Sequence, residues 1–281
     1  MRRIADYALQ KAGFALVGSG GLPRFHRYRV HRLRLPEPVT SGFLRATAFE
    51  VDLDRVTTPC GFSYAPDGWH PYRETLDQLL VNPDLPYEST ALCRFYDGFQ
   101  PSTVQEALLE DASEPVEPLC RWPPRLALFK HLWSLTPRDV SRILAAPHLH
   151  KGPRQQFGPQ DAEFGRVQVR RMWDAYRSVR DNGYQPEAYH DGHLTGYFLV
   201  RGDDYRFVVF YGNHRLAAFR ALGVQRLLAR VHPTDPPAIH WEDLEASSGN
   251  FGVLPADVAR RVFTKLFEET GRPKARALGL V

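Results

Sequence analysis

The chain has 281 residues, of which 43% are hydrophobic, and its 36 Lys and Arg against 32 Asp and Glu give a formal net charge of +4. This composition is typical of a globular protein with one or two domains, and it excludes collagen-like, coiled-coil and intrinsically disordered chains. Most of the basic residues are arginine, which we attribute to a bacterial genome of high GC content. The net charge is too small to indicate a nucleic-acid-binding protein by itself.

The N-terminus and the cysteines indicate the cellular compartment. No apolar run approaches the roughly 20 residues that a membrane span needs. Segment 1–21 is interrupted by Asp6 and Lys11, so it does not resemble a secretory signal, and its apolar spacing predicts a short amphipathic helix that ends at Gly18. The three cysteines are widely spaced and fit neither a disulfide framework nor a metal knuckle. We therefore expect a cytoplasmic protein with ordinary buried thiols.

The first half of the chain predicts a mixed and irregular region. Residues 26–38 combine basic, aromatic and β-branched side chains, which predicts a strand with one exposed face. Residues 49–56 alternate between hydrophobic and acidic side chains and predict a second half-buried strand. Residues 61–71 are rich in turn formers and aromatics, so we expect a structured loop there.

Two helices in this half have clear start signals. Ser102 and Thr103 provide capping chemistry for a helix over 104–109. Thr136 followed by proline begins a second helix, which Pro147 ends.

Two connections lie beside these helices. Segment 113–124 contains four prolines and predicts an extended connection across the surface. Segment 147–163 is polar and rich in glycine and proline, and we place a domain boundary there.

The second half has a more regular pattern. Apolar residues at helical spacing between Val169 and Val179 predict a helix that ends at Asn182-Gly183. Two strands over 193–200 and 205–210 joined by a hairpin turn, a helix over 215–222 and a strand over 227–231 follow. A terminal helix follows, with one apolar face formed by Val258, Val262, Phe263 and Leu266.

The junction between the second of these strands and the next helix has the chemistry of an anion site. Gly212 allows a close approach of the backbone to a ligand, and the first N–H groups of the helix point toward that position. Asn213 can cap the helix, His214 can donate to phosphate or titrate near neutral pH, and Arg215 can form paired hydrogen bonds with phosphate oxygens. We call residues 212–215 the box and expect it to bind a phosphate-bearing ligand.

The box and the upstream turn resemble the ParB/sulfiredoxin superfamily over roughly residues 167–232. In that family a helix and a GxxQP-like turn lead into a strand, and a later strand runs into a G-x-[HR]-R box that opens a helix ending in glycine. The resemblance implies that the box binds nucleotide phosphates through Gly212, Asn213, His214 and Arg215. It also implies that the turn formed by Gln185, Pro186 and Glu187 faces the box.

Departures from the family patterns narrow the expected activity. Sulfiredoxins carry cysteine immediately before the His-Arg pair, where this chain has Asn213, so that activity is not expected. The kinases that act on free serine resemble D-G-H-H-R at the box, and Tyr211 stands here at the acidic position. Partition proteins continue with a helix-turn-helix domain. The residues after His232 predict only one clear helix, so a DNA-binding protein that reads sequence is not expected.

Glu187 and His214 are the candidate catalytic residues. Phosphoryl transfer needs a general base near the acceptor hydroxyl together with cationic groups on the phosphates. Glu187 follows the Gln185-Pro186 turn and is the candidate base. The equal alternative is that Glu187 is an ordinary solvent-exposed carboxylate without a catalytic role. The HDGH sequence at 190–193 is weak evidence for a metal, so we read it as a plain turn and predict no protein-bound metal.

An aromatic-rich segment in the first half is the candidate second-substrate site. Trp69, His70 and Tyr72 lie beside Gly68, and aromatic faces can stack on sugars or bases. Such residues are more often part of a hydrophobic core, and that alternative stays open.

The sequence thus predicts a mixed α+β fold with a ParB/sulfiredoxin-like module. We expect an α+β region at 1–150, the phosphate-binding module at 151–235 and a helical extension at 236–281. The expected function is a nucleotide-dependent phosphotransferase or nucleotide hydrolase that acts on a small hydroxylated molecule, with ATP, ADP or CTP and Mg²⁺. Two alternatives are a non-catalytic accessory protein that binds a nucleotide or phosphate, and a nucleic-acid-binding protein or nuclease.

Overall fold

The computed structural model describes residues 14–17, 24–27, 49–109, 114–126, 132–145, 154–186, 192–231, 238–247 and 249–281. Its strands are β1 (Phe14–Val17), β2 (Arg24–Arg27), β3 (Phe49–Asp52), β4 (Val56–Thr57), β5 (Leu194–Arg201), β6 (Asp204–Tyr211), β7 (Arg226–Val231), β8 (Ala238–His240), β9 (Asn250–Phe251) and β10 (Leu254–Pro255). Its α-helices are α3 (Pro71–Val81), α4 (Ala91–Gly98), α5 (Val104–Leu108), α7 (Pro137–Ala145), α8 (Ala162–Asn182), α9 (Asn213–Ala221), α10 (Trp241–Ala246), α11 (Ala256–Glu268) and α12 (Arg272–Ala277). Short 3₁₀ helices are η2 (Leu53–Arg55), η3 (Tyr87–Ser89), η4 (Leu132–Ser134) and η6 (Arg154–Gln156).

A six-stranded mixed sheet forms the centre of the fold, in the order β3-β7-β5-β6-β4, with β8 also paired to β5. The hairpin of β5 and β6 is antiparallel, whereas β7 and β8 run parallel to β5. β3 pairs with β7 and β4 pairs with β6, so residues 49–57 contribute strands to both sides of the hairpin. The fold is α+β, as predicted. The division at residues 150 and 235 stays a prediction, although strands from before residue 150 share this sheet with strands after it.

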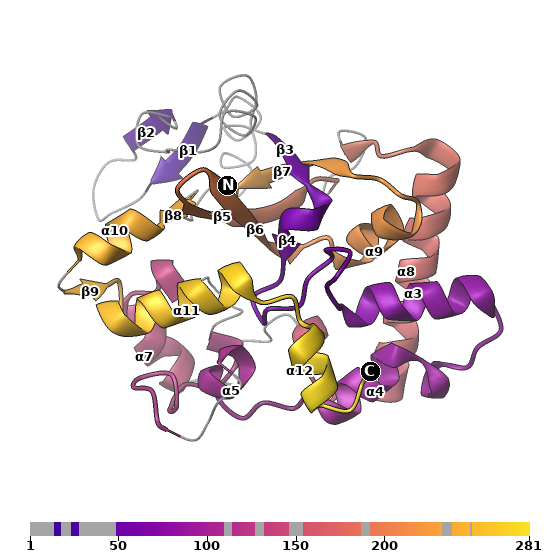
Figure 1. Ribbon diagram of the computed structural model, residues 1–281, viewed down its shortest axis with the longest axis horizontal. Coiled ribbons are helices and arrows are strands. Elements are labelled where there is room, and N and C mark those ends of the chain that lie inside the picture. The colour runs from indigo at the N-terminus through magenta and orange to yellow at the C-terminus, as the bar shows by residue number, and fades with distance from the viewer. Residues whose placement is uncertain are drawn as a thin grey trace.

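The two faces of the sheet pack into two hydrophobic cores because side chains alternate along each strand. Phe198 and Val200 of β5 point into the first core, whereas Tyr197 and Leu199 point into the second. Helices α3, α4, α8 and α9 contribute to the first core, and α5, α7, α10 and α11 contribute to the second. Figure 1 shows these two groups of helices on different sides of the molecule.

Most predicted elements of the second half are present at nearly the predicted bounds. Gly183 ends α8 at φ +71°, and Gly202 forms the hairpin turn at φ +56°. In the first half, α7 begins at Pro137 as predicted. Thr103 caps α5 through its hydroxyl, and the Glu106 carboxylate accepts a hydrogen bond from the backbone N–H of Ser102. The loop predicted at 61–71 is also present.

Two predictions about the first half were wrong, and a third is largely untested. Residues 14–17 form a strand instead of the end of a helix, because pairing with β2 gives them backbone partners that the local pattern does not reveal. The predicted strand at 49–56 is interrupted by η2, where the Asp52 carboxylate accepts a hydrogen bond from the backbone of Asp54 at 3.0 Å. The strand predicted at 26–38 lies mostly outside the described residues.

Segment 113–124 also differs from the prediction, because its described part is not an extended surface connection. Val116, Leu119 and Trp122 are buried in the second core. The side chain of Gln105 holds the segment through hydrogen bonds to the backbone of Glu114 and Val116 at 2.7 and 2.8 Å. The prolines interrupt regular structure, but the apolar residues between them still drive burial.

Candidate functional site

The box lies where β6 ends and α9 begins, and its glycine is required by the local geometry. Gly212 has φ +117° and directly precedes the first residue of α9. A Cβ atom at this position would lie 2.1 Å from Cδ2 of Leu194, so a side chain would need both a rare backbone conformation and displacement of the buried Leu194 side chain. α9 and its first free backbone N–H groups therefore begin directly after a turn whose conformation only glycine adopts without strain.

Asn213 is buried and links the box to the 61–71 loop. Its side chain is 2% exposed, and the hydroxyl of Tyr64 donates to its backbone carbonyl at 3.1 Å. The same hydroxyl lies 3.3 Å from the amide oxygen of Asn213. The N-cap of α9 is Gly212 and Asn213 is already the first residue of the helix, so the predicted capping role of Asn213 is replaced by an anchoring contact with Tyr64.

His214 is held neutral at physiological pH. Its Nε2 atom lies 3.1 Å from Oε1 of the buried Gln168, and the edge of its ring packs against Tyr72. The amide nitrogen of Gln168 donates to a backbone carbonyl of α8, so Oε1 is the acceptor and we assign the His214 proton to Nε2. Burial, together with the positive charges of Arg171 and Arg215, lowers the pKa of His214 to about 4.

Arg215 contacts the segment that leads into β5. Its guanidinium donates to the backbone carbonyl of Gly192 and, at 3.4 Å, to that of His193. The hydroxyl of Tyr184, just after α8, lies 3.2 Å from the same carbonyl oxygen and 2.8 Å from the carbonyl oxygen of Leu228. The box and the end of α8 therefore meet at one carbonyl group, which fixes the start of β5 relative to α9.

The predicted turn at 185–187 is only partly described. Pro186 is buried, and a Cβ atom on Gly192 would lie 1.8 Å from its carbonyl oxygen, so the turn packs closely on the residue that Arg215 contacts. The exposed Gln185 donates its amide to the carbonyl of Asn182 at 2.9 Å, which caps α8. Glu187, the candidate base, lies outside the described residues.

The aromatic residues predicted as a second-substrate site are buried. Trp69, His70 and Tyr72 are each no more than 3% exposed and belong to the interior beneath the box. His70 caps α3 by accepting from the backbone N–H of Tyr72 at 3.1 Å, and its ring stacks on Tyr64 with 4.2 Å between centroids. Burial, followed by the charges of His214 and Arg73, lowers the pKa of His70 well below its usual range. These residues belong to the packed interior next to the box, where Tyr72 contacts His214.

Sequence reasoning missed the residues of other elements that contact the box or act on it electrostatically. Gln168 and Arg171 lie one turn apart on α8, and Tyr64 lies in the loop before α3. The helical pattern of α8 was recognisable, but the partner of its polar face depends on how α8 packs against α9. Tyr64 is 149 residues from Asn213, and no local signal connects the two.

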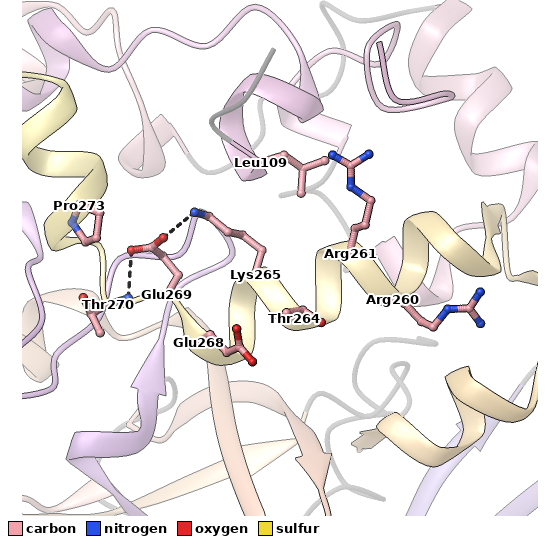
Figure 2. A pocket seen from close by; sticks show the side chains of 9 residues that line it. All are labelled: Leu109, Arg260, Arg261, Thr264, Lys265, Glu268, Glu269, Thr270 and Pro273. Carbon is pink, nitrogen blue, oxygen red and sulfur yellow. Dashed lines mark hydrogen bonds and ion pairs between the residues drawn. The ribbon is translucent and has the colours of Figure 1, made fainter. Parts of the chain in front are cut away.

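A second feature of the surface lies on the opposite side of the sheet. A hollow of about 740 Å³ runs along α11 and is lined by residues from Arg260 to Pro273 together with Leu109 (Figure 2). Lys265 pairs with Glu269 at 2.6 Å, and Arg260 donates to the carbonyl of Leu244 at 2.9 Å. Because α11 packs on the second core and α9 on the first, this hollow is separate from the box.

The described residues hold the positive groups that phosphates require but offer no carboxylate cluster for a metal. No group of three or more His, Cys, Asp or Glu suited to a metal ion occurs within the described ranges. Over the same ranges, no helix is long and apolar enough to cross a membrane.

Comparison with known protein families, curated proteins and solved structures finds no match to this chain. The resemblance to the ParB/sulfiredoxin superfamily therefore rests on the sequence pattern alone, and what it implies about function enters below as a proposal.

Proposed function

We propose that this chain binds the phosphates of a nucleotide at the box and uses the nucleotide for phosphoryl transfer to, or hydrolysis beside, a small hydroxylated molecule. The observation that carries the proposal is the convergence of two arginine charges on the first turn of α9. Burial is the main cause of the lowered pKa of His214, and the positive charges of Arg171 and Arg215 add to it. The N-terminus of α9 adds backbone N–H groups and the positive end of its dipole at the same place.

The residues of the box would have distinct roles in binding. Gly212 gives the phosphates close access to the backbone, and Arg171 supplies charge from the exposed face of α8. Arg215 fixes the segment at Gly192 and keeps its charge beside the first turn of α9. A bound phosphate would stabilise the protonated form of His214 and raise the pKa of that imidazole toward neutrality.

Catalysis needs a general base in addition to these groups. Glu187 remains the proposed base, and His214 is the second candidate because its ring is neutral at pH 7 and can accept a proton. Mg²⁺ would enter with the nucleotide and neutralise phosphate charge. We propose a cytoplasmic location, which agrees with the free thiols of Cys60, Cys93 and Cys120.

One observation favours the non-catalytic alternative. The three side chains of the box all make contacts within the protein: Asn213 with Tyr64, His214 with Gln168 and Arg215 with Gly192. A protein that only senses a nucleotide needs the binding surface without a movable base. Nucleic-acid binding is the third candidate and predicts a steep loss of affinity with salt.

Titration calorimetry with ATP, ADP and CTP in the presence of Mg²⁺ tests the binding proposal. We expect saturable binding by the wild type and a loss of about tenfold or more in Arg171→Ala, since one charge-assisted contact contributes about 1.5–3 kcal/mol. Arg177→Ala is the matched control, because Arg177 lies on the same helix and pairs with Asp174 at 2.7 Å. If no nucleotide binds, or if both variants lose affinity equally, the proposal is wrong.

Product analysis then separates the candidates. Consumption of the bound nucleotide with a panel of small hydroxylated acceptors supports the enzyme. Saturable binding without any product selects the accessory protein. Salt-sensitive binding of a labelled oligonucleotide, with no binding of free nucleotide, selects the third candidate.

A further inference from the structure

The last residue of β6 is turned to the other face of the sheet by an irregularity in strand pairing. Tyr197 pairs with Val208 and Gly196 with Val209, but Thr195 pairs with Tyr211, so Phe210 is an extra residue on β6. Such a bulge reverses the alternation of side chains and re-aims the residue that follows it. Without the bulge, Tyr211 would share the face of the buried Phe207 and Val209.

The consequence is an exposed aromatic ring directly beside the box. Phe207 and Val209 are fully buried, whereas Tyr211 is 61% exposed, although it belongs to the same strand. The side chain of Tyr211 makes no hydrogen bond or ring contact with the described part of the chain. Because Tyr211 immediately precedes Gly212, its ring and the N-terminus of α9 lie at the same end of β6.

The neighbours of Tyr211 add polar and apolar groups to the same face. Thr195 lies opposite it on β5, and Arg230 lies beside Thr195 on β7. Leu228 lies on the same face of β7, two residues before Arg230, and is 41% exposed. An aromatic face, a hydroxyl and a guanidinium are the groups that proteins use to hold a nucleobase by stacking and by hydrogen bonds to its edge.

We propose that Tyr211 is a stacking platform for the base of the nucleotide, with Thr195 and Arg230 at the edge of that base. This inference rests on the proposed function, because it requires the phosphates of the same ligand at the N-terminus of α9. The ligand then passes around the end of β6, with its phosphates on the side of α9 and its base on the side of Tyr211. The substrate class is therefore a nucleoside phosphate and excludes sugar phosphates without a base.

Titration calorimetry with ADP and with inorganic pyrophosphate tests the platform, because both ligands carry two phosphoryl groups and only ADP carries a base. For the wild type we expect ADP to bind more tightly than pyrophosphate. Tyr211→Ser should weaken ADP binding by about tenfold or more, since stacking contributes about 1–3 kcal/mol per base. The same variant should bind pyrophosphate as the wild type does, and Tyr211→Phe should bind both ligands normally.

The outcomes separate this inference from the function on which it rests. If the wild type binds neither ligand, the proposed function is wrong and the platform fails with it. If both ligands bind and Tyr211→Ser leaves ADP binding unchanged, only the platform is wrong. An equal loss for ADP and pyrophosphate in Tyr211→Ser also overturns the platform, because it shows an effect on the phosphate end. Val81→Ser, at a site 88% exposed on α3, controls for the loss of an exposed apolar side chain.

Discussion

The hydroxyl of Tyr64 donates to the backbone carbonyl of Asn213 at 3.1 Å, although the two residues are 149 positions apart in the sequence. Through this contact, the 61–71 loop supports the first residue of α9. The ring of His70 stacks on Tyr64, and Tyr72 packs against His214, so the same loop and the start of α3 contact two residues of the box. The geometry of the box thus depends on a segment that a search for a local motif does not include.

Replacement of Tyr64 by phenylalanine should destabilise the protein. The change removes the donor to Asn213 and leaves a buried carbonyl without that partner, which costs about 1–3 kcal/mol of unfolding free energy. Urea unfolding measures the loss. Tyr211→Phe is the control for stability, because the hydroxyl that it removes belongs to an exposed residue. Equal stabilities for the two variants would show that the Tyr64 contact is not important.

The stability of the protein should fall between pH 6.5 and pH 5. His214 has an ordinary pKa of 6.5 and a lowered pKa of about 4 in the folded protein, so the unfolded chain binds a proton first as the pH falls. This linkage removes about 2 kcal/mol by pH 5, and the lowered pKa of His70 acts in the same direction.

Urea unfolding at pH 7 and pH 5 checks this pH dependence. The variant His214→Gln cannot titrate, so its loss of stability between these two pH values should be smaller than that of the wild type. If the wild type is equally stable at both values, the two histidines are not buried in their neutral form.

Alanine at Gly212 should be far more costly than alanine at Gly202. Both glycines have positive φ, but a Cβ at Gly212 would meet Leu194 at 2.1 Å, whereas nothing lies within 4 Å of a Cβ at Gly202. We expect Gly202→Ala to cost about 1 kcal/mol and Gly212→Ala about 3 kcal/mol, because overpacking adds to the backbone strain. Thermal unfolding of the two variants measures the difference, and similar melting temperatures would contradict it.

The buried Lys274 should be a major determinant of stability. Its ammonium donates to the carbonyls of Cys60 and Ala107 at 2.9 Å each, and its side chain is 2% exposed. Lys274→Met leaves those carbonyls without this donor and should cost about 3 kcal/mol. Arg166→Met removes an exposed partner of Glu88 and should cost much less stability, because solvent screens that ion pair. A chemical unfolding experiment that ranks the two variants in the reverse order would disprove this role for Lys274.

The sequence predicted the second half of the fold well because its signals are local. Gly183 and Gly202 mark a helix end and a hairpin turn, and both have the positive φ that such turns need. The box was found from the same kind of signal, a glycine at the junction of a strand and a helix.

What the sequence did not predict depends on contacts between distant segments. The bulge that exposes Tyr211 arises from the register between β5 and β6, which no alternation within one strand reveals. The burial of Trp69 and His70 follows from the packing of α3 and α4 on the first core. The short strand β4 was included in one longer predicted strand because the turn at Asp52 was not recognised.

The order of the strands also constrains how this chain is made. The backbone of Asp52 is hydrogen-bonded to the hydroxyl of Tyr205, which is 153 residues later. Until the ribosome has synthesised the intervening residues, β3 and β4 lack their partner strands, and their apolar side chains stay exposed to solvent. β3 gains its partner strand only after β7 has been synthesised, and pairing between segments so far apart in the sequence is expected to slow folding.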